Sequence, residues 1–247
     1  MQQKYFNRFE IKYQISIVKR DDIIRHIKPL MELDPHVVNN HHYEVRSLYF
    51  DSPFKKSFFE KTNGIKTRVK LRIRYYPDFQ NGDEELVFIE LKKKNNENVS
   101  KNRILVPFGD AINILENKTP EAKNFYKNAT PEDKANLNEI WYLYKRYYLQ
   151  PVCLVCYDRQ PYVAKIKNRF RITFDTNVRV RNYNFNLHIG SEGCKYVVSP
   201  NIAIMEIKFN SFIPNWAIQI LQRNNVIQQK MSKFASGIEH TRSFGLV

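Results

Sequence analysis

The chain has 247 residues, of which 43% are hydrophobic, and this length suffices to bury one sizeable core. Lysine and arginine outnumber aspartate and glutamate by 40 to 25, so the formal net charge is +15 and the natural partner is an anion. No apolar run reaches the roughly 20 residues of a membrane helix, and the N-terminus lacks a signal peptide's apolar segment. We therefore expect a cytoplasmic protein in which residues 1–247 form a single domain.

Most of the chain is predicted to form β-strands, because runs rich in β-branched and aromatic residues alternate with a period of two. The predicted strands are 5–15, 43–51, 65–76, 84–93, 99–107, 151–159, 169–175, 178–183 and 202–209. A helix is expected after the first strand, where an apolar stripe contains Ile23, Ile24, Ile27, Leu30 and Met31. A second should begin at the N-cap Thr130 and run through Leu143, and a third should cover 214–222.

The segment TRVKLRIRYY carries the most informative charge pattern. Four cations, Arg68, Lys70, Arg72 and Arg74, alternate in it with apolar residues, so one face of the strand is basic and the other is apolar. Neighbouring cations would lie about 6.6 Å apart and repel by about 2.5 kcal/mol per pair at an effective dielectric of 20. Either open solvent or an enclosed space that holds a polyanion would tolerate such a row.

Other predicted strands repeat this division into an apolar and a charged face. The charged faces carry Glu10 and Lys12, Glu90 and Lys92, Lys101 and Arg103, Arg169 and Arg171, and Glu206 and Lys208. Ordinary small barrels fill their interior with hydrophobic side chains. We therefore predict an inverted α+β fold, a closed antiparallel eight-stranded β-barrel with a basic lumen and with helices packed outside. In such a barrel, removing Arg72 or Arg74 should relieve repulsion and leave the fold intact.

Three strands share a glutamate two residues before a lysine: Glu10-Ile11-Lys12, Glu90-Leu91-Lys92 and Glu206-Ile207-Lys208. A carboxylate beside a lysine on one face can hold a divalent cation against a phosphate. It can equally form an ion pair with that lysine. The sequence leaves both alternatives open.

Eight segments follow one another in the order found in a known group: RFEIKY, LRIRYY, FIELKK, VSKNR, CYDRQPY, FRITFDT, IMEIKF and QKMSKFASGI. On these motifs the chain resembles the polyphosphate polymerase domain of the vacuolar transporter chaperone (VTC) type, within the triphosphate tunnel metalloenzymes. The wider superfamily opens with Glu-x-Glu-x-Lys, and here Arg8 replaces the first glutamate. This departure favours the polymerase branch over adenylate cyclases and thiamine triphosphatases.

The resemblance also implies site residues. Phosphate binding falls to Lys12, Arg72, Arg74, Lys92, Lys101 and Arg159, with Tyr157 beside the last. Glu206 matches the metal-binding glutamate, which would hold Mn²⁺ or Mg²⁺, and Lys230, Ser232 and Lys233 match contacts to the phosphate chain at one end of the tunnel. Alternation alone adds Arg68, Lys70, Arg171 and Lys208.

The implied activity is that of a metal-dependent phosphotransferase, which moves the γ-phosphate of a nucleoside triphosphate, ATP above all, onto growing inorganic polyphosphate. Two alternatives stay open: a hydrolase of the same fold that cleaves triphosphate or short polyphosphate, and a non-enzymatic module that binds a polyanion or nucleic acid. Nucleic acid is not the expected partner, because the cations alternate on strands and no RNA-recognition or helix-turn-helix motif occurs. Eukaryotic members of the family also carry a sensing domain and membrane helices that this chain lacks, so we expect any membrane partner to be a separate protein.

Overall fold

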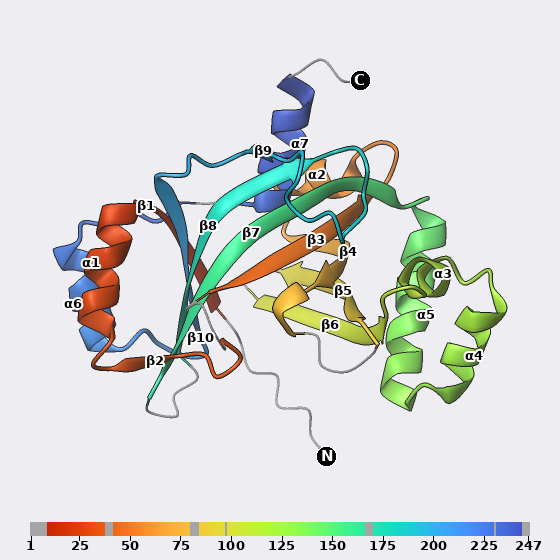
Figure 1. Ribbon diagram of the computed structural model, residues 1–247, viewed down its shortest axis with the longest axis horizontal. Helices are drawn as coiled ribbons and strands as arrows, with labels where there is room; N and C mark the ends of the chain where they lie inside the picture. The colour runs from red at the N-terminus through yellow and green to blue at the C-terminus, as the bar shows by residue number, and fades with distance from the viewer. Residues whose placement is uncertain are drawn as a thin grey trace.

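The computed structural model describes residues 9–37, 42–79, 84–96, 98–165, 170–229 and 231–243. Its centre is a curved antiparallel sheet with the strand order β1-β10-β8-β7-β3-β4-β5-β6 (Figure 1). These strands are β1 Phe9–Ser16, β3 Tyr43–Asp51, β4 Thr67–Tyr75, β5 Leu86–Asn95, β6 Asn98–Pro107, β7 Gln150–Ala164, β8 Arg171–Arg181 and β10 Ile202–Phe209. The shorter β2 Met31–Leu33 and β9 Lys195–Tyr196 pair with β7 and β8.

Helices lie at both ends of the sheet (Figure 1). The helices α1 Ile17–Ile27 and α6 Asn215–Arg223 pack together at one end, and α3 Ala111–Glu116, α4 Pro120–Asn128 and α5 Pro131–Arg146 gather at the other. The remaining elements are α2 Lys56–Thr62, the 3₁₀ turn η1 Pro77–Phe79 and α7 Lys233–Ser243. In the part of the chain described here, none of the helices has the length and apolarity to cross a bilayer.

The predicted elements match the structure wherever the local pattern was strong. The strand at 43–51 has the predicted bounds, and Thr130 caps α5 by accepting a hydrogen bond from the amide of Asp133. The predicted strands 169–175 and 178–183 instead form the single strand β8, which continues through Asn177 at a left-handed φ of 50°. Met31 does not belong to the first helix, because Pro29 follows its end and Met31 begins β2.

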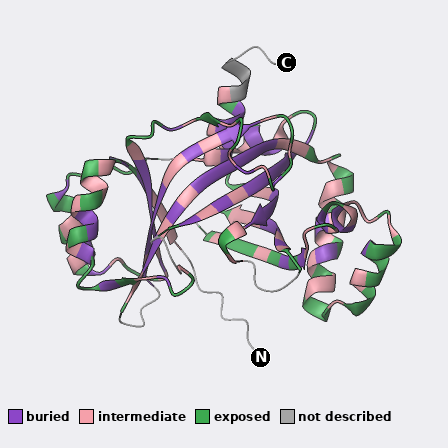
Figure 2. Ribbon diagram, viewed as in Figure 1, coloured by how far each residue is buried: buried purple, intermediate pink, exposed green. Residues whose placement is uncertain are grey.

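The apolar faces of the strands pack beneath the helices, as the alternation predicts. Figure 2 shows buried residues along the strands of the sheet. On one half of the sheet, Leu71, Ile73, Leu91 and Ile104 pack with Leu137 and Ile140 of α5 and with α3 and α4. On the other half, Ile172, Met205 and Ile207 pack with Ile23 and Ile27 of α1 and with Ala217 of α6. The two apolar cores therefore lie on the convex side, which leaves the charged faces on the concave side.

The prediction of a closed barrel needs correction. Among the described residues, β1 pairs along its length with β10, β6 pairs with β5, and no ladder joins β1 to β6. Side chains span this seam instead, because Lys92 Nζ of β5 donates to both carboxylate oxygens of Glu10 on β1 at 3.3 and 3.2 Å. Inward charged side chains of this kind prevent edge strands from pairing through their backbones.

A third apolar cluster lies on the concave side at one end, where α7 packs against the sheet (Figure 1). Phe234 is buried there with its ring centroid 5.1 Å from that of Tyr49, and Ala235 and Ile238 are buried beside it. The helix approaches the sheet closely at Gly237, where a Cβ atom would meet Val180 Cγ1 at 3.1 Å and Cys153 Sγ at 3.6 Å.

We expect Gly237→Val to push α7 away from the sheet and to lower the free energy of unfolding by about 1–3 kcal/mol, because the added methyl groups overpack this contact. The urea unfolding midpoint measures the effect. Gly109→Val is the matched control, since a Cβ atom at Gly109 meets nothing within 4 Å. Equal midpoints for the two variants would show that α7 does not pack as described.

Candidate functional site

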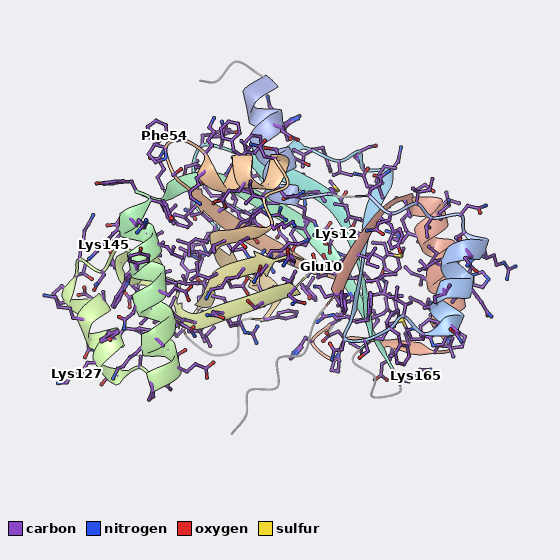
Figure 3. All side chains as sticks on the ribbon, turned by 180° about the vertical axis from the view of Figure 1, so that it is seen from behind. Glu10, Lys12, Phe54, Lys127, Lys145 and Lys165 are labelled. Atoms are coloured by element: carbon purple, nitrogen blue, oxygen red, sulfur yellow. The ribbon has the colours of Figure 1, made fainter. Side chains whose placement is uncertain are left out.

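Thirteen charged side chains gather on the concave side of the sheet, and we call them the inner cluster (Figure 3, where Glu10 and Lys12 are labelled). Its nine cations are Lys12, Lys70, Arg72, Arg74, Lys92, Lys101, Arg159, Lys208 and Lys233, and the exposed Arg103 of β6 lies on the same face but is not counted in the cluster. Its four carboxylates are Glu10, Glu90, Asp175 and Glu206. The structure thus brings together, from seven strands and α7, most of the residues that the sequence singled out.

Glu90 is the carboxylate that organises β4, β5 and β6. It is fully buried and receives Arg72 Nε at 2.7 Å and Lys101 Nζ at 3.0 Å, while Arg72 Nη1 also donates to the Tyr49 hydroxyl at 2.9 Å. Burial alone would raise the pKa of Glu90, but Arg72, Arg74 and Lys101 outweigh burial and lower it. Arg72 therefore has a partner of opposite charge, and the premise that its removal relieves repulsion does not hold.

Arg74 is fixed by neutral partners. Its Nε donates to Ser47 Oγ at 3.1 Å, and its Nη2 donates to the Tyr157 hydroxyl at 3.2 Å. The Arg74 residue as a whole is 5% exposed. Since hydroxyl oxygens carry no net charge, Arg74 is positioned while its own charge stays available to an anion.

Asp175 joins β7, β8 and α7. Its carboxylate receives both Nε and Nη2 of Arg159, at 2.7 and 2.8 Å, and Lys233 Nζ at 2.6 Å. Burial favours the protonated form, but Arg159 and Lys233 outweigh it and lower the pKa of Asp175 to about 2. Asp175 was missed by the sequence analysis, although the period-two series Arg171, Thr173, Asp175 places it on the charged face.

Two neighbouring carboxylates, Glu10 and Glu206, face each other across Lys12. Lys12 Nζ lies 3.0 Å from Glu10 Oε1 and 3.7 Å from Glu206 Oε2, and Lys208 Nζ lies 2.6 Å from Glu206 Oε1. Burial and Glu206 both raise the pKa of Glu10, but Lys12, Lys92 and Lys208 outweigh them and lower it to about 2. Burial likewise opposes the ionised form of Glu206, but Lys208 and Lys12 bring its pKa well below the usual value.

Lys70 differs from the other cations, because no ion pair to it occurs among the residues described. Its Nζ donates to Ser232 Oγ at 3.3 Å and lies 4.4 Å from the ring centroid of Phe234. Burial first, and then repulsion by Lys92 and Lys12, lower its pKa to about 7. Lys70 thus occupies the part of the cluster where positive charge is least compensated.

Three predicted site residues lie apart from the cluster or cannot be placed. Arg68 donates to the Ile65 carbonyl at 2.7 Å at the exposed end of β4. Arg171 is the register partner of Lys208, but its guanidinium pairs with Asp34 at 2.9 Å. Lys230 lies outside the described residues. Tyr157 and Ser232 do join the cluster, through Arg74 and Lys70.

The residues present fit a divalent cation only if phosphate oxygens complete its coordination. Nowhere in the described ranges do three or more His, Cys, Asp or Glu side chains form a group that could hold a metal. Glu10 and Glu206 nevertheless offer adjacent carboxylates on either side of Lys12. This donor set suits Mg²⁺ or a similar ion, which proteins often bind through one or two carboxylates and substrate phosphates.

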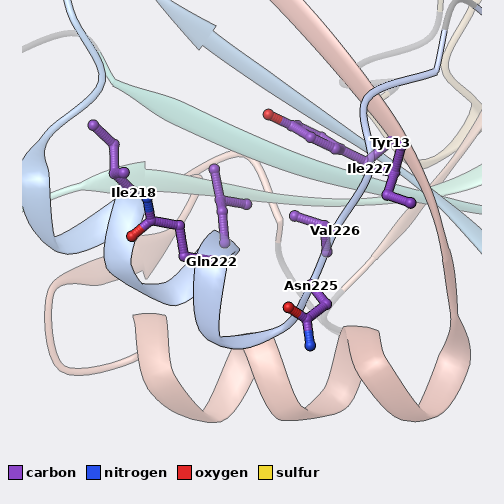
Figure 4. Close-up of a pocket in the computed structure, with 7 residues that line it drawn as sticks. Tyr13, Ile218, Gln222, Asn225, Val226 and Ile227 are labelled. Atoms are coloured by element: carbon purple, nitrogen blue, oxygen red, sulfur yellow. The ribbon is translucent and has the colours of Figure 1, made fainter.

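A surface hollow beside α6 does not belong to this site (Figure 4). Its lining includes Tyr13, Ile218, Val226 and Ile227. Tyr13 belongs to the apolar core under α1 and α6, whereas the neighbouring Lys12 joins the inner cluster. The sheet therefore separates this hollow from the charged side chains.

Comparison with known families gives a clear result. A family model described as the VTC domain matches residues 7–242. The chain belongs to the VTC domain family. No curated protein sequence matches this VTC domain.

Several solved structures are similar to this VTC domain. A candidate adenylate cyclase from Bacillus halodurans is 13% identical, with 92% of this chain and 95% of that chain covered and a TM-score of 0.49. The PH1819 protein from Pyrococcus horikoshii is 14% identical, with coverages of 94% and 99% and a TM-score of 0.46. A candidate adenylyl cyclase from Hippeastrum with a dominant triphosphatase activity is 14% identical, with coverages of 95% and 96% and a TM-score of 0.44.

We expect Lys70→Met to stabilise the unliganded VTC domain at neutral pH. Folding lowers the pKa of Lys70 from 10.5 to about 7. Below pH 7 the side chain is protonated in both the folded and the unfolded state, so its full free-energy cost opposes folding. This cost decreases as the pH rises from 7 toward 10.5. The gain in urea midpoint should therefore be largest at pH 6 and vanish near pH 10.

Arg72→Met is the contrasting variant. It leaves the fully buried Glu90 with Lys101 as its remaining ion-pair partner among the described residues, so we expect a loss of about 3–5 kcal/mol in the free energy of unfolding. If Lys70→Met destabilises the protein as much as Arg72→Met does, then Lys70 has a carboxylate partner. The conclusion that its positive charge is uncompensated would then be wrong.

Proposed function

We propose that this VTC domain is a polyphosphate polymerase, which transfers the γ-phosphate of a nucleoside triphosphate, ATP above all, onto a growing chain of inorganic polyphosphate. The observation that supports this most is the imbalance of the inner cluster, where nine cations face four carboxylates on the concave side of the sheet. A linear polyanion would supply the missing negative charge along the whole row. A single small anion would compensate only part of it.

In the proposed reaction, a terminal oxygen of the polyphosphate attacks the γ-phosphorus in line. A new P–O bond forms to the acceptor, the bond from the γ-phosphorus to the β-bridging oxygen breaks, and the nucleoside diphosphate leaves with the electron pair. No protein nucleophile takes part, so catalysis rests on positioning and on compensating charge. Arg74 suits this task, because Ser47 and Tyr157 hold its planar guanidinium while its charge remains available.

The remaining residues would bind phosphates as point charges or as orienting groups. Lys12, Lys92, Lys101 and Lys208 are assigned to the phosphates near the carboxylates, and Arg72 and Arg159 to the donor. Lys70, Ser232 and Lys233, next to α7, are assigned to the acceptor chain, and Lys230 would extend this group. Arg68 and Arg171 lie farther out and would meet the chain outside the cluster.

Glu206, assisted by Glu10, would hold a divalent cation against the donor phosphates. Such a cation would withdraw charge from the phosphate oxygens and make the γ-phosphorus more electrophilic. When it binds, Lys208 and Lys12 would exchange their carboxylate partners for phosphate oxygens. The charge balance of the site would then be kept.

The choice of acceptor distinguishes transfer from hydrolysis. The end of a polyphosphate chain already carries an anionic oxygen, whereas water must lose a proton to a base. Each carboxylate of the inner cluster is paired with a lysine or an arginine, so none is placed as an unpaired base for water. This arrangement supports the polymerase over the alternative hydrolase.

Incubation of the protein with ATP and Mn²⁺ or Mg²⁺ should yield long phosphate chains, which appear as a ladder on a polyacrylamide gel. Arg74→Ala should lower the rate on the order of 100- to 1,000-fold, because it removes a positioned donor. Lys145→Ala is the control, since Lys145 lies on α5 away from the concave side (Figure 3). Release of free phosphate without a ladder would favour the hydrolase.

Glu206→Gln should weaken the metal dependence of the reaction, with a metal requirement shifted on the order of 100-fold, because the amide is a poorer ligand than the carboxylate. Titration of activity with Mn²⁺ measures this shift. Glu139→Gln serves as the control, because Glu139 pairs with Lys93 on the convex side. An unchanged titration for Glu206→Gln would move the metal to other ligands, with Glu10 and Glu90 as the next candidates.

A further inference from the structure

On the concave side, the charged rows of side chains on β4, β5 and β6 all end in apolar side chains at the same end of these strands. The rows are Arg72 and Arg74 of β4, followed by Tyr76 just beyond the end of that strand, then Lys92, Glu90 and Phe88 on β5, and Lys101, Arg103 and Leu105 on β6. We call Tyr76, Phe88 and Leu105 the apolar lip.

The strand register places the members of the lip next to one another. Phe88 is the register partner of Arg74 on one side and of Leu105 on the other. The ring centroids of Tyr76 and Phe88 lie 6.1 Å apart, and Arg103 Cζ lies 4.7 Å from the ring centroid of Phe88. The lip is therefore continuous, and it directly adjoins the guanidinium groups of Arg74 and Arg103.

The lip is not part of the apolar cores on the convex side. Leu105 is 46% exposed, whereas its strand neighbours Ile104 and Val106 are buried on the opposite face. Phe88 is likewise only partly buried, between the fully buried Val87 and Ile89. Apart from the third apolar cluster, against which Tyr76 also packs, the concave side is mainly charged, and at Phe88 and Leu105 it offers partly open apolar and aromatic surface.

We propose that the apolar lip is a platform for the nucleobase of the donor nucleotide, an inference that rests on the proposed function. A nucleoside triphosphate has an aromatic end and an anionic end, and the lip followed by Arg74 and Arg72 has the same order of chemistry along β4. The base would lie on Phe88 and Tyr76, and the triphosphate would extend along the two arginines, which lie about 6.6 Å apart on the strand.

This placement orients the donor. The β4 row runs from Lys70, which contacts Ser232 at the start of α7, through Arg72 and Arg74 to Tyr76 at the other end. With its base at Tyr76, the nucleotide points its γ-phosphate toward Lys70 and α7. The acceptor chain then approaches from the α7 end, and the nucleoside diphosphate leaves past the lip.

The chemistry of the lip also sets its selectivity. Aromatic rings and planar guanidinium groups stack on the face of any base, and stacking is tolerant of base identity. Phe88 and Leu105 have no polar side-chain atom with which to read a base edge. The platform would bind ATP, GTP, CTP and UTP, and it would bind the nucleotides with the larger purine bases more tightly.

The test compares ATP with inorganic tripolyphosphate, which has the same charged group and no base. The Phe88→Ala and Leu105→Ser double variant should raise the Kd for ATP about 5- to 100-fold, as expected for loss of one stacked base. Its Kd for tripolyphosphate should stay within about twofold of the wild-type value. The fluorescence of etheno-ATP, which changes on stacking, should change on binding to the wild type and not on binding to the variant.

Tyr148→Ala is the control, because Tyr148 is an exposed aromatic residue beyond α5. Phe88→Leu preserves apolar volume without the ring and should show the same selective loss if the double variant does not fold. Equal loss for both ligands, no loss for either, or wild-type protein that binds tripolyphosphate but not ATP would each overturn the platform. A selective loss of ATP binding in a protein that forms no polymer would keep the platform and overturn only the polymerase.

Discussion

Buried carboxylates hold the cations of the concave side in place, and the rest of the structure depends on these ion pairs. Glu90, Asp175 and Glu206 are each at most 4% exposed and each receives at least two cations. Removing one partner leaves the other charge buried and unpaired. The resulting loss of stability is far larger than the net stabilisation that the intact pair provides. The anions therefore fix where lysine and arginine side chains point before any substrate is bound.

Because the concave side is charged, the apolar side chains of the strands lie mainly on the convex side. The cores under α1 and α6 and under α3 to α5 are the consequence, and each is a separate cluster because the sheet curves between them. The third cluster, around Phe234 of α7, is the exception, since it places apolar groups on the concave side at one end. The helices are thus needed to cover what an ordinary barrel would enclose.

Period-two alternation predicted much of this arrangement, because residues two apart in a strand lie on the same face of the sheet. It located Lys12, Arg72 and Lys92 on one side and the cores on the other, and the strand at 43–51 was predicted with its bounds. Alternation could not show which residues pair across strands, so the bond between Arg72 and Glu90 and the role of Asp175 emerged only from the register. It also could not separate Arg171 from the cluster, since its partner Asp34 lies in a turn that carries no periodic signal.

The seam between β1 and β6, which the bond between Lys92 and Glu10 crosses, gives the curved sheet a property that a fully laddered barrel lacks. Backbone pairing holds neighbouring strands at about 4.8 Å, whereas the bond between Lys92 and Glu10 joins two flexible side chains. When added negative charge draws Lys92 away from Glu10, the distance between β1 and β6 can increase without the loss of any ladder hydrogen bond between these strands. The width of the concave side can therefore change at this seam while the strands on either side keep their register.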